Sequence, residues 1–310
     1  MNISRIKKLI MGLVGATMVV FSASLAGCET PKPHAVITFE FNETEYAVEY
    51  TLQRDTCPHT VRRFIELADL GYYDNTVIHD VQTNDWFTGG YAYEAEEYAA
   101  RATENALADY LGSHSKYNEF MQLFNGNKLS VSVYGNHAYD SRGNEVPEQS
   151  TKLHTLLGEF KSNIKQVIKN DKRVANYGCL KMYYYKDETE TAKNSKVYVM
   201  PTSDQIIMAD YKKNNATSLF GVQMGDSSSY AIGDYAVFAM LASDAARDKL
   251  EELEEAVHNY ENYDTIDAPV MVNVGELDDA THAFKDKLIE KKFNAPNTAI
   301  VIKTVKITKY

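Results

Sequence analysis

The sequence has little cysteine, an excess of acidic over basic charge, and no long apolar run beyond its first thirty residues. It contains 3 Cys among 310 residues, and 32 Lys and Arg against 43 Asp and Glu give a formal net charge of −11. Phosphate backbones need a clustered positive field, so we expect no nucleic-acid partner. The mean hydropathy of −0.39 excludes a protein with many membrane spans. The 8 histidines lack HxxxH, HExxH or CxxC spacing, and we expect no metal site and no other cofactor.

The composition favours a folded chain. Hydrophobic residues make up 44% of the sequence, and 22 of the residues are tyrosines. This apolar and aromatic content excludes a disordered chain, and the length allows one large domain or two ordinary ones.

The first 27 residues have the layout of an export signal. Arg5, Lys7 and Lys8 precede an apolar run over 9–26, and no acidic residue occurs before Cys28. The run ends in Leu25-Ala-Gly-Cys28, which resembles the lipobox of bacterial lipoproteins, where cleavage precedes a cysteine that carries a diacylglycerol. Buried acyl chains stabilise membrane association by about 0.8 kcal/mol per CH₂. The alternative is an uncleaved single transmembrane anchor.

Both interpretations place the remaining chain at the extracytoplasmic face of the cell membrane. We predict a lipoprotein signal peptide at 1–27, a lipidated tether at 28–34 and one domain at 35–310. Removal of the signal changes the formal charge from −11 to −14, because three basic residues are lost. Anionic headgroups repel such a domain, so the attachment is expected to come from the lipid on Cys28.

Two cysteines remain in the mature chain, Cys57 and Cys179. An oxidising compartment permits a disulfide between them, but two cysteines far apart in sequence are equally consistent with two separate buried thiols.

Alternating and helical patterns predict the elements of the mature chain. Residues 35–41 and 46–52 alternate as two strands of a hairpin with Asn42 and Glu43 in the turn. A helix over 59–70 is framed by acceptor side chains, Pro58 and Gly71. A charged helix is predicted over 244–260, and further strands are predicted at 77–81, 86–87, 179–185, 196–200, 205–208, 236–241 and 298–307.

The segment between Gly90 and Gly178 contains helix formers and tyrosines, mostly within about 91–143. We predict a helical insertion there. It is either a decorated loop that covers one end of the domain or a surface that binds a partner.

Several motifs occur in an order that resembles one family. The helix that begins Thr60-Val-Arg-Arg-Phe64 leads to Gly71-Tyr-Tyr73 and Ile78-His79, and Gly89-Gly90 follow. These segments are similar to the T-V-x-N-F, G-x-Y and F-H-R motifs and the paired glycines of the cyclophilin-type peptidyl-prolyl cis-trans isomerases. Later matches to the family occur at 158–163, 178–182, 204–208, 233–238 and 300–307.

The resemblance implies a mainly β fold with helices, namely a closed antiparallel eight-stranded barrel capped by helices. It also implies proline-containing segments of exported proteins as ligands. Rotation about an X–Pro bond crosses roughly 18–20 kcal/mol, and the enzyme lowers this barrier with an apolar pocket and donors that polarise the twisting amide. In the family the main donor is the arginine of F-H-R.

This chain departs from the family at its groove. The arginine position is Asp80, an acceptor in place of a donor. Loss of one such electrostatic donor typically costs about 3–4 kcal/mol. Arg62, Arg63 and His79 lie nearby in sequence and are candidate substitutes, although an exposed helix face and a structural histidine explain them as well. By resemblance the groove positions are Asp80, Asp85, Trp86, Thr88, Gln205, Ile207 and Tyr235.

Two main hypotheses follow. The first is a membrane-anchored extracytoplasmic peptidyl-prolyl cis-trans isomerase or foldase for exported proteins, with a degenerate site and weak or lost activity. The second is a noncatalytic peptide- or protein-binding module that keeps the barrel. A third hypothesis, a small-solute-binding lipoprotein, is consistent with Cys28 but has no support from the barrel motifs.

Overall fold

The fold is that of a computed structural model of the chain. The structure describes residues 31–101, 104–126, 128–129, 132–136, 151–155, 159, 176–183, 195–202, 205–211, 218–225, 235–273, 276–277, 284–286 and 288–310. The predicted signal peptide at 1–27 and Cys28 lie outside these residues. The description below concerns the compact unit Pro33–Tyr310.

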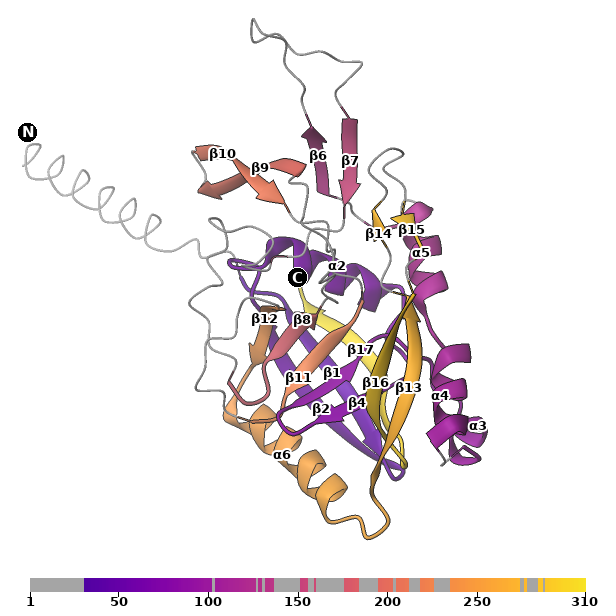
Figure 1. The fold of residues 1–310 in the computed structure, drawn as a ribbon. Coiled ribbons are helices and arrows are strands. Elements are labelled where there is room, and N and C mark those ends of the chain that lie inside the picture. Colours follow the sequence, from indigo (N-terminus) through magenta and orange to yellow (C-terminus); the bar gives the residue numbers. More distant parts are fainter. Residues whose placement is uncertain are drawn as a thin grey trace, which may run out of the picture. The chain divides into compact units, whose positions relative to one another are not determined.

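A strongly curled antiparallel sheet is the main element of the fold (Figure 1). In the part of the chain that the structure describes, it has nine strands in the order β3-β17-β1-β2-β12-β8-β11-β5-β4. These strands are β1 (His34–Phe41), β2 (Thr44–Leu52), β3 (Thr76–Val77), β4 (Asp80–Gln82), β5 (Asp85–Thr88), β8 (Leu180–Tyr183), β11 (Phe220–Gln223), β12 (Tyr235–Leu241) and β17 (Ile300–Lys309).

The β1–β2 hairpin shows how the sequence pattern produces the sheet. Alternate residues of β1 are buried, so one face of the strand joins the core. Asn42 and Glu43 form the turn with φ of 47° and 63°, a left-handed conformation that asparagine tolerates better than most residues. The hairpin, its turn and the closing strand β17 confirm the predictions for 35–41, 46–52 and 298–307.

The two edge strands of the sheet, β3 and β4, are consecutive in the chain. Between them, Ile78 N–H donates to the Ile300 carbonyl at 2.8 Å and His79 N–H donates to the Phe87 carbonyl at 2.9 Å. The segment 76–82 therefore connects β17 at one end of the strand order with β5 at the other. This arrangement confirms a mainly β, barrel-like fold with helices, with one more strand than the eight predicted.

Two helices pack on the sheet, α2 (Pro58–Asp69) and α6 (Asp244–His258). Figure 1 shows them at opposite ends of the curled sheet. Both contribute to one core, in which the Phe64 ring lies 5.0 Å from that of Phe238 and 5.7 Å from that of Phe220. The apolar spacing predicted α2, and the charged, helix-forming composition of 244–260 predicted α6.

The start of α2 differs from the prediction. No side chain next to the helix caps it. The carboxylate of Glu159 instead accepts the backbone N–H groups of His59 at 3.2 Å and Thr60 at 2.9 Å. Orphan donors of a first turn need such an acceptor, and here it comes from a residue about a hundred positions later.

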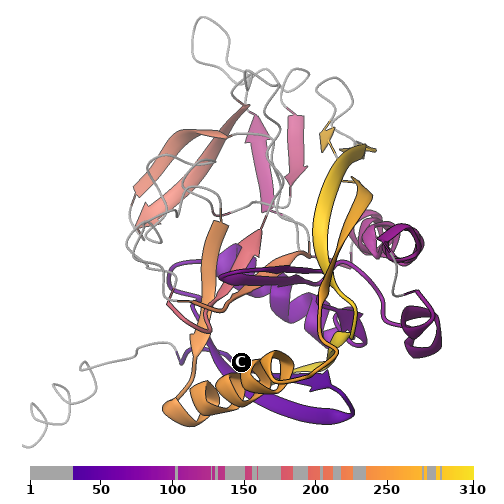
Figure 2. The same ribbon diagram turned by 60° about the horizontal axis from the view of Figure 1, so that its bottom comes forward.

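A second, smaller core joins two segments that are far apart in sequence. Helices α3 (Ala95–Ala99) and α4 (Glu104–Ser113) pack against the hairpin of β13 (Thr265–Asn273) and β16 (Leu288–Pro296), as Figures 1 and 2 both show. Its buried side chains include Tyr98, Leu107, Tyr110, Val270 and Phe293. This core explains the apolar and tyrosine-rich composition of the first segment.

The predicted helical insertion at 91–143 is only partly helical. It contains α3, α4 and α5 (Tyr117–Asn125), but also β6 (Ser132–Asn136), which pairs with β7 (Thr151–Thr155). Helix α4 contacts the chain's own β13, and Tyr98 of α3 donates to the Pro296 carbonyl of β16, so this part acts as an internal layer. The remaining small sheets are β9 (Ser195–Thr202) with β10 (Gln205–Tyr211), and β14 (Glu276–Leu277) with β15 (Phe284–Lys285).

Candidate functional site

The hairpin of β4 and β5 carries four of the seven positions that the sequence resemblance assigns to a groove, namely Asp80, Asp85, Trp86 and Thr88. Asp80 is paired with Phe87 across the hairpin, and Val81 is paired with Trp86. Along β5 burial alternates, so Trp86 and Thr88 face the core while Asp85 and Phe87 lie on the outer face. Asp80 and Phe87 are therefore neighbours on the outer surface of the sheet.

Asp80 is held by two hydrogen bonds. Its Oδ1 accepts the backbone N–H of Asn294 at 2.9 Å and the Nε2–H of Gln82 at 2.7 Å. Burial raises the pKa of the Asp80 carboxyl above its usual range, and the two hydrogen bonds oppose that rise. Asn294 belongs to β16, so the carboxylate connects the edge of the main sheet to the second hairpin.

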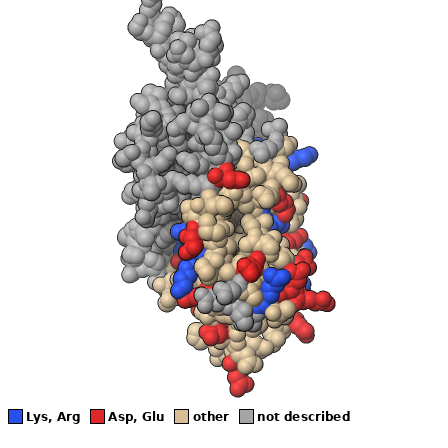
Figure 3. All heavy atoms as spheres, turned by 45° about the vertical axis from the view of Figure 1, so that its right-hand side comes forward, with Lys and Arg blue, Asp and Glu red and all other residues tan. Residues whose placement is uncertain are grey.

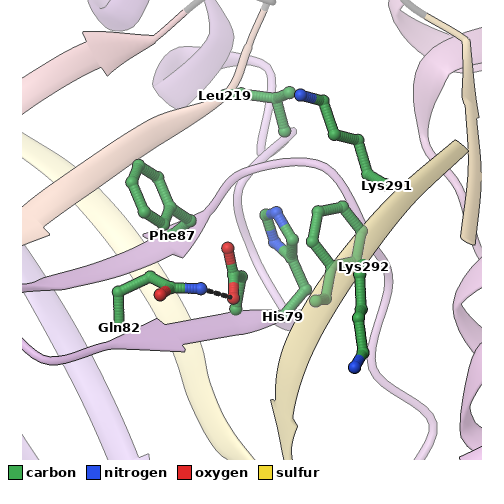
Figure 4. A pocket seen from close by; sticks show the side chains of 8 residues that line it. His79, Gln82, Phe87, Leu219, Lys291 and Lys292 are labelled. Carbon is green, nitrogen blue, oxygen red and sulfur yellow. Dashed lines mark hydrogen bonds between the residues drawn. The ribbon is translucent and has the colours of Figure 1, made fainter. Parts of the chain in front are cut away.

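A pocket of about 260 Å³ opens beside Asp80 (Figure 4). The main sheet contributes His79, Asp80, Gln82 and Phe87, and Leu219 precedes β11. The opposite wall comes from β16, with Lys291, Lys292 and Phe293. The pocket thus lies between residues 79–82 and 87 of the main sheet and the hairpin of β13 and β16.

His79 forms the inner part of this pocket. Its side chain is 1% exposed, and its ring lies 4.6 Å from that of Tyr91 and 4.9 Å from that of Phe293. Burial lowers the pKa of His79 to about 3, so the imidazole is neutral near pH 7. A neutral imidazole provides no positive charge in the pocket.

Asp85 lies on the same outer face as Asp80 but contacts other residues. It forms an ion pair with Lys181 of β8, and Lys181 Nζ also donates to the Gln223 side chain at 2.7 Å. Lys181 is 3% exposed and Gln223 is 2% exposed. Burial raises the pKa of Asp85, and Lys181 opposes that rise. The partly exposed Asp85 and the buried Lys181 and Gln223 thus form a polar cluster across β5, β8 and β11.

Trp86 and Thr88 point the other way. Trp86 is 5% exposed and belongs to the main core. Thr88 is fully buried, and its hydroxyl donates to the Val77 carbonyl at 3.1 Å. Neither residue lines the pocket at Asp80, so their side chains stabilise the sheet.

The other three positions lie outside the β4–β5 hairpin, on two other strands. Gln205 and Ile207 belong to β10, which pairs with β9, whereas the strand hydrogen-bonded to β5 is β11. Tyr235 begins β12 and pairs with Tyr183. Among the aligned residues whose side chains the structure describes, Asp80 is the one that lines the pocket.

Arg62 and Arg63, the candidate substitutes for the arginine, lie on α2. Arg62 forms an ion pair with Glu66 on the exposed face of that helix at 3.2 Å. Arg63 is 2% exposed. Neither lines the pocket at Asp80.

Sequence reasoning missed the wall that β16 supplies. Lys291, Lys292 and Phe293 lie in a segment for which no strand was predicted, and Leu219 lies outside the matched motifs. The available signal was the alternation in 265–273, which gives buried Ala268, Val270 and Val272.

Other sequence predictions bear on chemistry as well. Cys57 and Cys179 are free thiols, and both are buried, which excludes the disulfide between them. Among the described residues, no three His, Cys, Asp or Glu side chains gather as a metal would require. No helix in the described part of the chain is long and apolar enough to cross a membrane.

Comparison with known proteins identifies the family. No curated protein matches the chain. Solved structures of the Cryptosporidium parvum cyclophilin type peptidyl-prolyl cis-trans isomerase are similar to it at 14% identity. The form with the dipeptide Ala-Pro matches with a TM-score of 0.36 over 89% of this chain and 99% of that one. The form without the dipeptide has a TM-score of 0.35 over 90% and 99%. The model of the family described as cyclophilin type peptidyl-prolyl cis-trans isomerase/CLD matches residues 36–276, and the chain belongs to that family.

Proposed function

We propose that this chain is a peptide-binding cyclophilin of the extracytoplasmic face of the cell membrane, held there by a lipid on Cys28. It binds proline-containing segments of exported proteins, with little or no isomerase turnover. The observation that carries the proposal is the environment of Asp80, which stands where family resemblance places the catalytic arginine. Its Oδ1 accepts the backbone N–H of Asn294, so this oxygen is already hydrogen-bonded to strand β16 of the same chain.

The physical reason concerns the twisted amide. An amide that loses resonance gains electron density on its oxygen, and catalysis requires a donor aimed at that oxygen. The Asp80 carboxylate only accepts hydrogen bonds and repels such an oxygen. The neighbouring His79 is neutral near pH 7 and fully packed between two rings. Binding of a peptide does not need this donor, because an apolar surface suffices.

One observation favours a second candidate, an isomerase with an altered site. Lys291 lines the same pocket as Asp80, from the opposite wall. An ammonium group there is a donor for a substrate carbonyl, although it lacks the fixed fork of a guanidinium. In this candidate Lys291 takes the role of the missing arginine, and turnover is weak.

NMR exchange measurements on a blocked proline tetrapeptide, with the purified full chain, separate the two candidates. The proposal expects peptide signals to shift or broaden on binding while the cis–trans exchange rate stays near the uncatalysed value. Turnover well above that value, lost in Lys291→Met, would establish the second candidate and overturn the first. Lys292→Met is the matched control, because Lys292 lines the same pocket but is paired with Asp267.

The attachment is tested separately by cell fractionation. The proposal expects the wild-type chain in the membrane fraction and Cys28→Ala in the soluble fraction. If Cys28→Ala stays in the membrane, the lipid anchor is refuted and an uncleaved N-terminal anchor takes its place. Labelling with a radioactive fatty acid adds an independent readout of the lipid.

A further inference from the structure

The tether determines which end of the main sheet lies next to the membrane. In the proposed function a lipid on Cys28 holds the chain there, and Pro33 is five residues further along. A chain advances at most about 3.6 Å per residue, so this tether spans at most about 18 Å. The Pro33 carbonyl accepts the N–H of Leu52 at 2.8 Å, so the tether ends at a fixed point of the fold. The residues around that point are therefore held within reach of the lipid headgroups.

Three segments that are far apart in sequence meet at this end. His34, the first residue of β1, is paired with Lys309 of β17. Tyr310 follows, and its hydroxyl donates to Asp69 Oδ1 of α2 at 2.8 Å. Leu70, the next residue, is the C-cap of α2, and Figure 1 shows the C-terminus beside this helix. Because neighbouring strands lie about 4.8 Å apart, Tyr310 lies close to the end of the tether.

Leu70 and Tyr310 expose apolar surface at this end. Tyr310 is 64% exposed and Leu70 is 49% exposed. In the described part of the chain, the other exposed large hydrophobic side chains are Met271 and Leu288, on the second hairpin. Half of this set thus lies beside the tether. Tyrosine is favoured at membrane interfaces because its ring is apolar and its hydroxyl is polar, and leucine favours the acyl chains beneath.

The charges at this end suit lipid phosphates. Lys306 and Lys309 of β17 are both exposed. Lysines near a membrane surface are attracted to anionic lipids. The neighbouring Asp69 carboxylate is occupied by the Tyr310 hydroxyl. This end therefore offers an aromatic ring, an apolar side chain and two ammonium groups together.

The side of α3 and α4 is acidic by comparison. Figure 3 shows acidic side chains spread over the described surface on that side. Exposed residues there include Glu94, Glu96, Glu97 and Asp109. Anionic headgroups repel a surface of this kind. The acidic net charge of the domain therefore disfavours contact through that side and leaves the end with the lysines as the better match.

We propose that the face formed by Leu70, Lys306, Lys309 and Tyr310, here called the docking face, rests on the lipid bilayer that anchors the chain. The contact depends on the proposed function, because the lipid on Cys28 brings this end to the bilayer. Leu70 and Tyr310 enter the interface, and the two lysines contact lipid phosphates. The domain then has one preferred orientation on the membrane and does not rotate freely on its tether.

The test uses the full lipidated mature chain in vesicles of phosphatidylcholine and phosphatidylglycerol. An environment-sensitive fluorophore is attached at Thr308→Cys, next to the docking face, or at Thr265→Cys, at the start of β13. Both threonines are exposed, and the native Cys57 and Cys179 are buried. We expect the label at position 308 to emit at shorter wavelength in vesicles and to be protected from aqueous iodide. The label at position 265 should show neither effect.

Two double substitutions locate the contact. Leu70→Ser with Tyr310→Ser should abolish the protection of the label at position 308, while the chain stays on the vesicles through its lipid. Met271→Ser with Leu288→Ser is the matched control, because it also removes two exposed large hydrophobic side chains. In this control the protection should remain. All four side chains are exposed, so neither pair opens a cavity in the core.

Flotation of the vesicles separates the docking face from the anchor. If the chain floats with the vesicles but iodide quenches the labels at 308 and 265 equally, the docking face is overturned and the lipid anchor stands. Protection that persists in Leu70→Ser with Tyr310→Ser, or that is lost equally in the control pair, overturns the docking face as well. If the wild-type chain does not float, the lipid anchor of the proposed function fails, and the docking face fails with it.

Discussion

Replacement of Asp80 by alanine is expected to loosen the second hairpin from the main sheet. The carboxylate accepts the N–H of Asn294 at 2.9 Å and so joins β4 to β16. A hydrogen bond to a charged group contributes about 1.5–3 kcal/mol. We therefore expect Asp80→Ala to lower the free energy of unfolding by about 2 kcal/mol.

Two further substitutions at this position test the cause. Asp80→Asn retains an oxygen that accepts the N–H of Asn294, so we expect a loss below about 1 kcal/mol. Asp80→Arg restores the family's residue but removes the acceptor and faces Lys291 across the pocket. We expect it to destabilise the fold at least as much as alanine does, and not to raise isomerase turnover.

Urea unfolding at equilibrium gives the stabilities, and amide hydrogen exchange reports on Asn294 directly. We expect the wild type to be the most stable, Asp80→Asn to be slightly less stable, and Asp80→Ala and Asp80→Arg to be the least stable. Exchange at Asn294 should accelerate in the alanine and arginine variants. If Asp80→Ala unfolds at the wild-type urea concentration and Asn294 exchanges at the wild-type rate, the carboxylate does not anchor the hairpin.

Three more predictions concern other parts of the fold. Burial raises the pKa of Glu159 from 4.5 to about 7, so the folded state binds the proton more tightly than the unfolded state. The free energy of unfolding should therefore fall by about 3 kcal/mol as the pH rises from 4.5 to about 7. Urea unfolding of Glu159→Gln should show no such fall, and a pH profile identical to that of the wild type would refute the prediction. Tyr98→Phe removes the 2.6 Å hydrogen bond to the Pro296 carbonyl and should cost about 1 kcal/mol in thermal unfolding. Gly178→Ala combines a φ of +76° with a Cβ 2.3 Å from Leu241 Cδ1, and should cost about 1–3 kcal/mol; an unchanged melting temperature would contradict either prediction.

The main sheet was predictable because its signals are local. Alternation in β1 and β2, the turn at Asn42 and Glu43, and the apolar spacing of α2 each involve only neighbouring residues. The cap of α2 was not predictable in this way. Its acceptor, Glu159, reaches the helix through the tertiary fold, and nothing in the residues next to Pro58 indicates it.

The candidate site was predictable in position but not in orientation. Asp80, which the motif at 78–80 singled out, lines a pocket. However, successive residues of a strand face opposite sides, so alignment to a motif does not say which residues of β5 point outward. Trp86 and Thr88 face the core and Phe87 faces the pocket.

The strand beside β5 shows a second limit. The run at 205–208 is rich in isoleucine and predicts a strand, and in the structure it forms part of strand β10. The residues that pair with β5 are instead Phe220–Gln223, which contain a glycine and form a weaker strand pattern. A strand pattern does not specify its partner, because pairing depends on contacts far away in sequence.

The second hairpin was missed for a chemical reason. Its first strand contains Pro269, and a proline within an alternating run argues against a strand. In the described part of the chain β13 pairs with β16 alone, so it is an edge strand and tolerates a residue that cannot donate.

The carboxylate at position 80 becomes understandable once this hairpin is included. An arginine needs space and an open groove to act on a substrate amide, whereas the N–H of Asn294 needs an acceptor. The second core fixes β16 next to β4 through Phe293, which is 3% exposed and packs on His79. With β16 in that position, a carboxylate satisfies the backbone and a guanidinium would leave it unpaired. The carboxylate at position 80 therefore supports the wall that gives this chain its pocket.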